Sequence, residues 1–313
     1  MKLFVQIPCL NEEATLASVI ETIPTSIDGI DEIEILVIDD GSSDRTREVA
    51  EALGVRHFVR HTRNMGLARS FRDGVDYALL HGADIVVNTD GDNQYPQESI
   101  AELVQPIVAG QADIVIGDRQ TRTIEHFSRF KRSMQALGSR AASIAAGVDL
   151  PDAASGFRAY SKYALIRLNI VTRFSYCMET IVQAGYKRLA VTSIPIRTNP
   201  KTRESRLFSN IWQHMFQSGS AIVRVYLMYR PIALFAWIST LLAIGGLVPF
   251  VRYLILRETD AGGDHVQSLL LGVVLVITAL LAMVIGVVAD LTRLNRTLAE
   301  DTLDLQKLLR YGD

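Results

Sequence analysis

Two carboxylates, Asp90 and Asp92, stand one residue apart directly after the apolar run 85–87, and Gln94 follows two positions later. An apolar run bounded by polar residues predicts a buried strand, so this segment is expected just beyond the strand's carboxyl end. Carboxylate oxygens at this spacing can share one hard divalent cation, Mg²⁺ or Mn²⁺, and an extended segment puts Gln94 on the same side. The same residues also form ordinary turns, so the pair alone leaves a plain turn open.

A second acidic pair, Asp39 and Asp40, ends the apolar run 33–38 and leads into Gly41 and Ser42. These acids make little structural sense at the end of a strand unless cations or polar ligands meet them. The alternative is a common turn in which Asp44 caps the next helix.

The segment 63–68 opens a helix that we expect to run to Leu80. Gly66 stands at its start, between Arg63 and Arg69, and a helix amino terminus of this kind suits a phosphate or a nucleotide. An ordinary solvated helix start is the alternative.

Strand, polar turn and helix alternate through this part of the chain. We expect a strand at 3–7 closed by Pro8, a helix from an Asn11 cap to Ile23, a strand at 33–38, a helix at 45–53 and a strand at 55–59. This order predicts an α/β fold, a parallel sheet covered by helices on both faces. Ligands on such sheets bind beyond the carboxyl ends of the strands, where all four acids fall.

Composition sets the class of protein. The chain has 313 residues and a net charge of −2, which gives no electrostatic reason to expect a nucleic-acid partner. Two cysteines outside any Cys-x-x-Cys motif predict no disulfide framework and fit a reduced, cytosolic setting. The first residues form too short an apolar run for a signal peptide.

The last third of the chain is more apolar than the rest and contains two long apolar runs, at about 232–251 and 268–289. Each is long enough to cross a hydrocarbon core of roughly 30 Å, so 231–289 is expected to be a transmembrane hairpin. A buried soluble hairpin is the alternative. The connection 252–267 is near neutral, whereas Arg224, Arg230, Arg293 and Arg296 flank the hairpin, so both termini are expected in the cytoplasm.

Two amphipathic segments flank the hairpin. Residues 207–230 combine apolar residues at helical spacing with basic neighbours, which predicts an interfacial helix along the membrane or, alternatively, a core helix. Residues 290–313 carry a leucine stripe on a charged tail, which could pack on the first domain or pair between protomers, so a homo-oligomer stays open.

Four motifs occur together in one order: residues 6–13, 39–42, 64–66 and 90–94. In that order and spacing they resemble family 2 glycosyltransferases of the GT-A fold, and more narrowly the dolichyl- or undecaprenyl-phosphate sugar synthases. The resemblance covers roughly residues 3–200, so we take 1–206 as the catalytic domain.

The resemblance implies a nucleotide-sugar donor, UDP- or GDP-linked, and a metal ion. It assigns the donor to a set of eight residues: Pro8, Asn11, Glu12, Asp39, Asp40, Asn64, Gly66 and Asp90. It assigns Mg²⁺ or Mn²⁺ to Asp90, Asp92 and Gln94.

The resemblance also implies a polyprenyl phosphate acceptor in the membrane. A strand at 114–118 delivers Arg119, and the implied phosphate contacts are Arg119, Arg132, Ser155 and Arg158. The planar guanidinium suits a phosphate, although a surface role is the alternative for any single arginine. Asp92, Arg119 and Arg132 are expected to carry the reaction. Glu179 fits a sugar contact or, the interpretation we favour, an exposed helix position.

The implied reaction is a single inverting displacement in which the anionic acceptor phosphate needs no dedicated base. Departures from the family pattern, at Leu67-Ala68, Ala136 and Arg203, leave the acceptor and the sugar open. A processive polysaccharide synthase would carry Gln-x-x-Arg-Trp, and neither Trp212 nor Trp237 follows an arginine. A nucleotidyltransferase would carry a glycine-rich loop after the first strand. A membrane-tethered binder without activity remains the non-enzymatic alternative.

Overall fold

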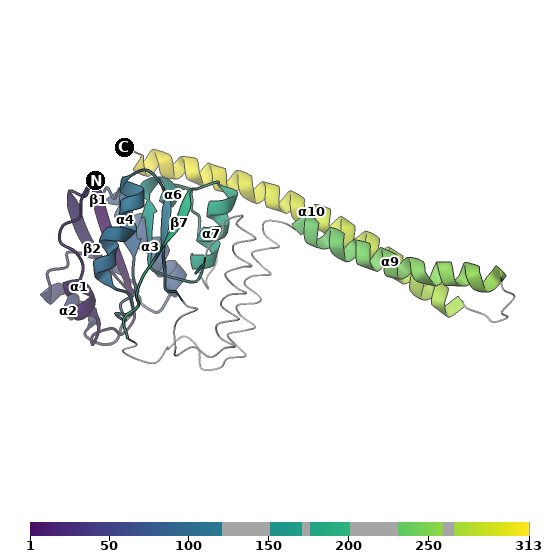
Figure 1. Ribbon diagram of the computed structural model, residues 1–313, viewed down its shortest axis with the longest axis horizontal. Coiled ribbons are helices and arrows are strands. Elements are labelled where there is room, and N and C mark those ends of the chain that lie inside the picture. The colour runs from purple at the N-terminus through teal and green to yellow at the C-terminus, as the bar shows by residue number, and fades with distance from the viewer. Residues whose placement is uncertain (121–150, 171–175, 201–230, 259–265, 313) are drawn as a thin grey trace. The chain divides into compact units, whose positions relative to one another are not determined.

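The computed structural model describes residues 1–120, 151–170, 176–200, 231–258 and 266–312 (Figure 1). The chain divides into two compact units. One comprises Met1–Ile222 with Leu303–Asp313, and the other comprises Val223–Thr302.

Among the described residues, seven strands form one sheet in the order β3-β2-β1-β4-β6-β5-β7. The strands are β1 Lys2–Cys9, β2 Glu32–Asp39, β3 His57–Arg60, β4 Ile85–Asn88, β5 Ile114–Asp118, β6 Arg158–Ser161 and β7 Val191–Pro195. Only β6 runs antiparallel to its neighbours, β4 and β5. The predicted α/β fold with a mostly parallel sheet is therefore confirmed.

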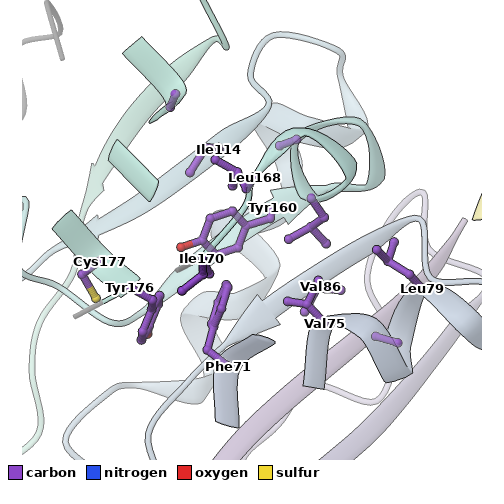
Figure 2. Packing of buried hydrophobic residues seen from close by; sticks show 14 of the residues in the cluster. Phe71, Val75, Leu79, Val86, Ile114, Tyr160, Leu168, Ile170, Tyr176 and Cys177 are labelled. Carbon is purple, nitrogen blue, oxygen red and sulfur yellow. The ribbon is translucent and has the colours of Figure 1, made fainter. Parts of the chain in front are cut away.

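Helices cover both faces of this sheet (Figure 1). They are α1 Leu16–Glu21, α2 Thr46–Ala52, α3 Leu67–Leu80, the 3₁₀ turn η1 Gln97–Ser99, α4 Ile100–Val108, α6 Lys162–Arg167 and α7 Tyr176–Tyr186. Side chains alternate along β1, so Phe4 enters one apolar cluster while Val5 enters the other. Figure 2 shows the first cluster, in which Phe71 of α3 stacks on Tyr176 of α7 with ring centroids 4.1 Å apart.

The predicted start of the first helix is wrong. Helix α1 begins at Leu16 with Thr15 as its cap residue, whereas Asn11 has a left-handed backbone with φ of 57°. The Asn11 Oδ1 accepts a hydrogen bond from the Ser43 N–H at 2.8 Å, so this side chain joins two loops instead of capping a helix. The predicted end of α3 at Leu80 is confirmed.

Two helices near the C-terminus, α9 Pro231–Glu258 and α10 Val266–Tyr311, are long and apolar enough to cross a membrane. Within their unit they pack closely. Ser239 Oγ donates to the Ala279 carbonyl at 2.8 Å, and a Cβ added at Gly246 would lie 3.0 Å from the Gly272 carbonyl oxygen. Both helices exceed the predicted spans, and α10 continues without a break through the predicted tail.

The last turns of α10 belong to the sheet-containing unit. Asp304 accepts hydrogen bonds from Lys187 Nζ and Asn169 Nδ2, each at 2.7 Å. Lys307 Nζ donates to the Leu168 carbonyl at 2.7 Å, and Tyr311 is buried in the same apolar cluster as Phe4. The end of the tail therefore packs on its own chain, the first of the two predicted alternatives.

Candidate active site

The predicted site residues gather at one edge of the sheet. Strands β1, β2 and β4 are parallel, and β5 shares their direction because both β4 and β5 run antiparallel to β6. Their carboxyl ends therefore meet at one edge, with Asp39 ending β2, Asp90 following β4 and Arg119 following β5. Backbone hydrogen bonds extend the ladder past the strands, from the Asp40 N–H to the Cys9 carbonyl at 2.9 Å and from the Thr89 N–H to the Gln6 carbonyl at 3.1 Å.

Asp90 and Asp92 form a half-buried acidic pair. Burial, together with the charge of Asp92, raises the pKa of Asp90 to about 7, while Arg119 acts in the opposite direction. A carboxylate that resists ionisation in this way gains from a cation beside it. The pair therefore fits a divalent ion on the chemistry of its donors.

The rest of the ion's coordination would not come from acids. Within the part of the chain that the structure describes, no three or more His, Cys, Asp or Glu side chains converge as a metal site. A Mg²⁺ or Mn²⁺ ion that uses one or two carboxylates and completes its shell with phosphate oxygens and water is compatible with such a pair.

Gln94 contacts Asp92 twice. Its side-chain amide donates to Asp92 Oδ2 at 2.6 Å, and its backbone N–H donates to Asp92 Oδ1 at 3.1 Å. These two hydrogen bonds orient Asp92, and the role of Gln94 as a metal ligand stays a prediction.

The loop before β6 is fastened directly against Asp90. The Gly156 N–H donates to Tyr95 Oη at 3.0 Å, and the Gly156 carbonyl accepts from Asn88 Nδ2 at 3.1 Å and from Tyr176 Oη at 3.2 Å. A Cβ added at Gly156 would lie 3.5 Å from Asp90 Oδ2. Sequence reasoning missed Asn88, Tyr95 and Tyr176, although an asparagine ending an apolar strand was a usable signal for Asn88.

Arg119 is oriented by Asp152. Its Nε and Nη2 donate to the two Asp152 carboxylate oxygens at 2.7 and 2.9 Å. Burial alone would raise the pKa of Asp152, but the hydrogen bonds and charge of Arg119 lower it, so the pair is ionised. The Arg119 side chain keeps about a fifth of its surface exposed, at 20%. Its guanidinium is therefore held in one orientation at the sheet edge.

Arg158 does not lie where an acceptor phosphate was predicted to meet it. The side chain is fully buried and donates to four groups of its own chain: the Ser155, Ala153 and Cys177 carbonyls and the Thr180 hydroxyl. It stands on β6 opposite Asn88 and Ile116, so it ties the loop and α7 to the sheet. Ser155 is also fully buried, and its hydroxyl has no hydrogen-bond partner among the described residues.

The predicted donor residues come from two loops that the structure packs together. The Asn11 N–H donates to Ser42 Oγ at 3.0 Å, the Glu12 N–H donates to Thr46 Oγ1 at 2.8 Å and Asp39 Oδ1 accepts from the Ser42 N–H at 2.8 Å. Pro8, Asn11, Glu12, Asp39 and Asp40 therefore surround one corner of the edge.

The segment that starts α3 completes this corner. The Asp40 carboxylate accepts from the Met65 N–H at 2.7 Å and the Gly66 N–H at 2.9 Å. Asp40 is thus committed to holding the segment 63–66, in which Asn64 is exposed.

Comparison with known proteins names the family. A family model for glycosyl transferase family 2 matches residues 4–168, more than half of the chain. The chain belongs to that family. A dolichyl-phosphate hexose transferase of Haloferax volcanii is 30% identical over 213 residues, which cover 68% of this chain and 86% of the relative. A polyprenol monophosphomannose synthase of Mycolicibacterium smegmatis is 27% identical, with 67% and 83% covered.

A solved structure gives the fold of this glycosyltransferase. Glucosyl-3-phosphoglycerate synthase from Mycobacterium tuberculosis, in complex with Mn²⁺, UDP and glucosyl-3-phosphoglycerate, superimposes with a TM-score of 0.53 at 23% identity. The match covers 72% of this chain and 78% of that one. The predicted GT-A fold is therefore confirmed.

Some predictions for the glycosyltransferase lie outside the described residues, namely those for Arg132, Ala136, Arg203 and the segment 207–230. Glu179 does lie within them. The favoured interpretation of Glu179 as an exposed helix residue is wrong, because it is 1% exposed on α7. Gln183, one turn further along the helix, donates to its carboxylate at 3.4 Å.

Proposed function

We propose that this glycosyltransferase moves a single sugar from a UDP- or GDP-sugar to the phosphate of a membrane polyprenyl phosphate, with inversion and with the help of a divalent metal ion. The observation that carries the proposal is the half-buried Asp90–Asp92 pair at the carboxyl edge of the sheet, with the Gly156 loop packed against Asp90. Such a pair suits a reaction in which a diphosphate must be bound and its charge neutralised.

The metal ion, Mg²⁺ or Mn²⁺, would be held by Asp90 and Asp92 and would neutralise charge on the departing nucleoside diphosphate. Gln94 keeps Asp92 in one orientation through two hydrogen bonds. Pro8, Asn11, Glu12 and Asp39 bind the nucleoside beside this pair.

The acceptor reacts through a phosphate oxygen. That oxygen forms a bond to the anomeric carbon of the sugar, while the bond from this carbon to the diphosphate oxygen breaks and the nucleoside diphosphate leaves with the electron pair. A phosphate monoester has a second pKa of about 6, so it is already anionic at neutral pH. The enzyme therefore needs to position the acceptor phosphate and does not need a base that removes a proton from it. Arg119, oriented by Asp152, binds that phosphate together with Arg132 and the Ser155 hydroxyl.

A lipid acceptor is supported by two further observations. Helices α9 and α10 are long and apolar enough to cross a membrane. The relatives from Haloferax volcanii and Mycolicibacterium smegmatis are named for dolichyl phosphate and for a polyprenol product. We infer a protein of the cell membrane with its catalytic domain and both termini in the cytoplasm, because arginines flank the hairpin.

The test uses the full chain in detergent or lipid with undecaprenyl phosphate, Mg²⁺ or Mn²⁺ and a panel of UDP- and GDP-sugars. We expect a glycosylated lipid phosphate from one donor and a loss of on the order of a hundredfold or more in Asp92→Ala. Asp28→Ala, which removes an exposed carboxylate, is the matched control and should retain full activity. Sugar released to water only, sugar added to a growing polymer, or donor binding without turnover would each contradict the proposal.

A further inference from the structure

His61 connects two acidic groups beside the donor corner. It follows β3 directly, and its N–H donates to the Asp39 carbonyl at 2.9 Å, which continues the β2–β3 ladder by one residue. The ring Nδ1 lies 2.7 Å from Asp40 Oδ1, and the ring Nε2 lies 3.1 Å from Asp73 Oδ2. Asp40 ends the β2 segment and Asp73 lies on α3, so one ring joins the sheet edge to the helix.

Both contacts are hydrogen bonds at once only when both ring nitrogens carry protons. The ring therefore bridges two carboxylates that come from different elements. Arg69 Nε donates to the same Asp73 oxygen at 2.6 Å, and Arg72 lies 3.7 Å from the other one. The His61 and Asp40 side chains are 9% and 8% exposed, so little water screens their attraction.

The carboxylate that His61 holds is the one that fixes the start of α3. Asp40 accepts the N–H groups of both Met65 and Gly66, so its position determines where the segment 63–66 lies. Gly41 packs against the same segment, because a Cβ added there would lie 2.7 Å from the Arg63 carbonyl carbon. An Asp40 free to rotate could not hold two adjacent amides.

We propose that His61 is a positioning residue for the donor side of the site, acting through Asp40 on the segment 63–66. This inference rests on the proposed function and on the donor contacts that the family resemblance implies for Asn64 and Gly66. His61 itself touches neither substrate. With His61 removed, Asp40 loses the ring that contacts its Oδ1, and the segment loses its fixed position.

The test compares His61→Ala with His81→Ala in the full chain. His81 is an exposed histidine at the far end of α3 and serves as the matched control. For His61→Ala we expect the KM for the donor and the Kd for the free nucleoside diphosphate to rise about tenfold or more, which is the scale of a lost charge-assisted hydrogen bond. The KM for the lipid acceptor should stay within twofold of the wild type. Amide hydrogen exchange at Met65 and Gly66 should become faster, and His81→Ala should change none of these quantities.

Asp73→Asn is the second variant in case His61→Ala fails to fold, because it weakens the same ring contact from a half-buried position on α3. It should shift the donor KM in the same direction and by less. In the double variant the two effects should not add, because both act through one ring. Unchanged exchange at Met65 and Gly66, or a lower Tm with an unchanged donor Kd, would overturn the proposal. A wild-type protein that binds no nucleotide would contradict the proposed function, and the exchange rates would then still decide the role of His61.

Discussion

At the scale of single residues, acids of one type serve different purposes at the same sheet edge. Asp40 and Asp152 are each saturated by hydrogen bonds from their own chain, the first from two backbone amides and the second from a guanidinium. Asp90 instead meets a second carboxylate, Asp92, and its pKa rises to about 7. A half-buried carboxylate whose ionised form is disfavoured in this way is typical of a functional position.

The raised pKa of Asp90 predicts how metal affinity depends on pH. Below about 7 a proton occupies the carboxylate and competes with the ion, whereas above that value the ion binds a carboxylate that is already ionised. Competition by one proton weakens Mn²⁺ binding by roughly tenfold for each pH unit below the pKa. Titration of Mn²⁺ with UDP or GDP present, followed by electron paramagnetic resonance from pH 5.5 to 8.5, measures this slope. An affinity that does not change over this interval would contradict the prediction.

We expect the removal of the Arg158 guanidinium to lower the stability of the fold. Its guanidinium is fully buried and bonded to four groups, so Arg158→Met leaves three carbonyls and a hydroxyl without their donor. We expect a loss of about 3 kcal/mol or more and a Tm lower by roughly 5 °C or more. Arg56→Met, at an exposed position, is the control and should shift the Tm by no more than about 1 °C. Thermal unfolding of both variants in the same detergent checks this, and equal values of Tm would show that the buried network contributes little.

At the scale of elements, glycines allow loops to pack closely where a larger side chain would not fit. Gly41 and Gly54 both have left-handed backbones, with φ of 80° and 82°. They differ in surroundings. A Cβ at Gly41 would meet the Arg63 backbone at 2.7 Å, whereas a Cβ at Gly54 would meet nothing within 4 Å.

This difference makes a matched pair of variants. Gly54→Ala should cost only the strain of a left-handed alanine, about 1 kcal/mol, and should leave the donor Kd unchanged. Gly41→Ala carries the same strain and also displaces the segment 63–66, so we expect a larger fall in Tm and weaker donor binding. Thermal unfolding and calorimetric titration with UDP or GDP distinguish the two. Equal effects of both variants would refute close packing between these loops.

Much of the fold and part of the site could be predicted from the sequence. The strands β1, β2 and β4 are mostly apolar runs with clear ends, so the acids that follow β2 and β4 could be placed at one sheet edge. Strand β6 could not, because Arg158–Ser161 is four residues long, starts with a charged residue and runs antiparallel. The loop that leads into β6 contacts residues more than 60 positions away in the sequence, as Gly156 contacts Asn88. A pattern within a short window of sequence does not predict such contacts. The hydrogen bonds of Arg158 and Gln94 could not be predicted for a related reason, since residue type alone does not say which atom meets which partner.

At the scale of the whole molecule, one helix takes part in both compact units. Helix α10 runs from Val266 to Tyr311, and the boundary between the units falls within it, at Thr302 and Leu303. Its last turns are fastened to the sheet-containing unit by Asp304 and Lys307. These turns therefore follow the alternative in which the tail packs on the catalytic domain.

Replacing Asp304 tests how strongly the last turns of α10 are attached to the sheet-containing unit. The Asp304–Lys187 pair is largely buried, with the two side chains 14% and 11% exposed, so Asp304→Ala leaves an ammonium group and the Asn169 amide without their carboxylate. We expect a loss of about 2 kcal/mol and a Tm lower by a few degrees. Asp301→Ala removes an exposed carboxylate one turn earlier and is the control. Faster amide exchange in the last turns of α10, seen only for Asp304→Ala, would accompany the fall in Tm, and its absence would count against this attachment.

The burial of Tyr311 among residues such as Phe4 and Leu36 also bears on how the protein is made. A ribosome releases Phe4 first and Tyr311 some three hundred residues later, after both apolar helices have emerged. The apolar cluster on that face of the sheet therefore stays incomplete until the last turns of α10 arrive. Both long apolar helices are synthesised before that step, so the catalytic domain reaches its final packing only after they have been made.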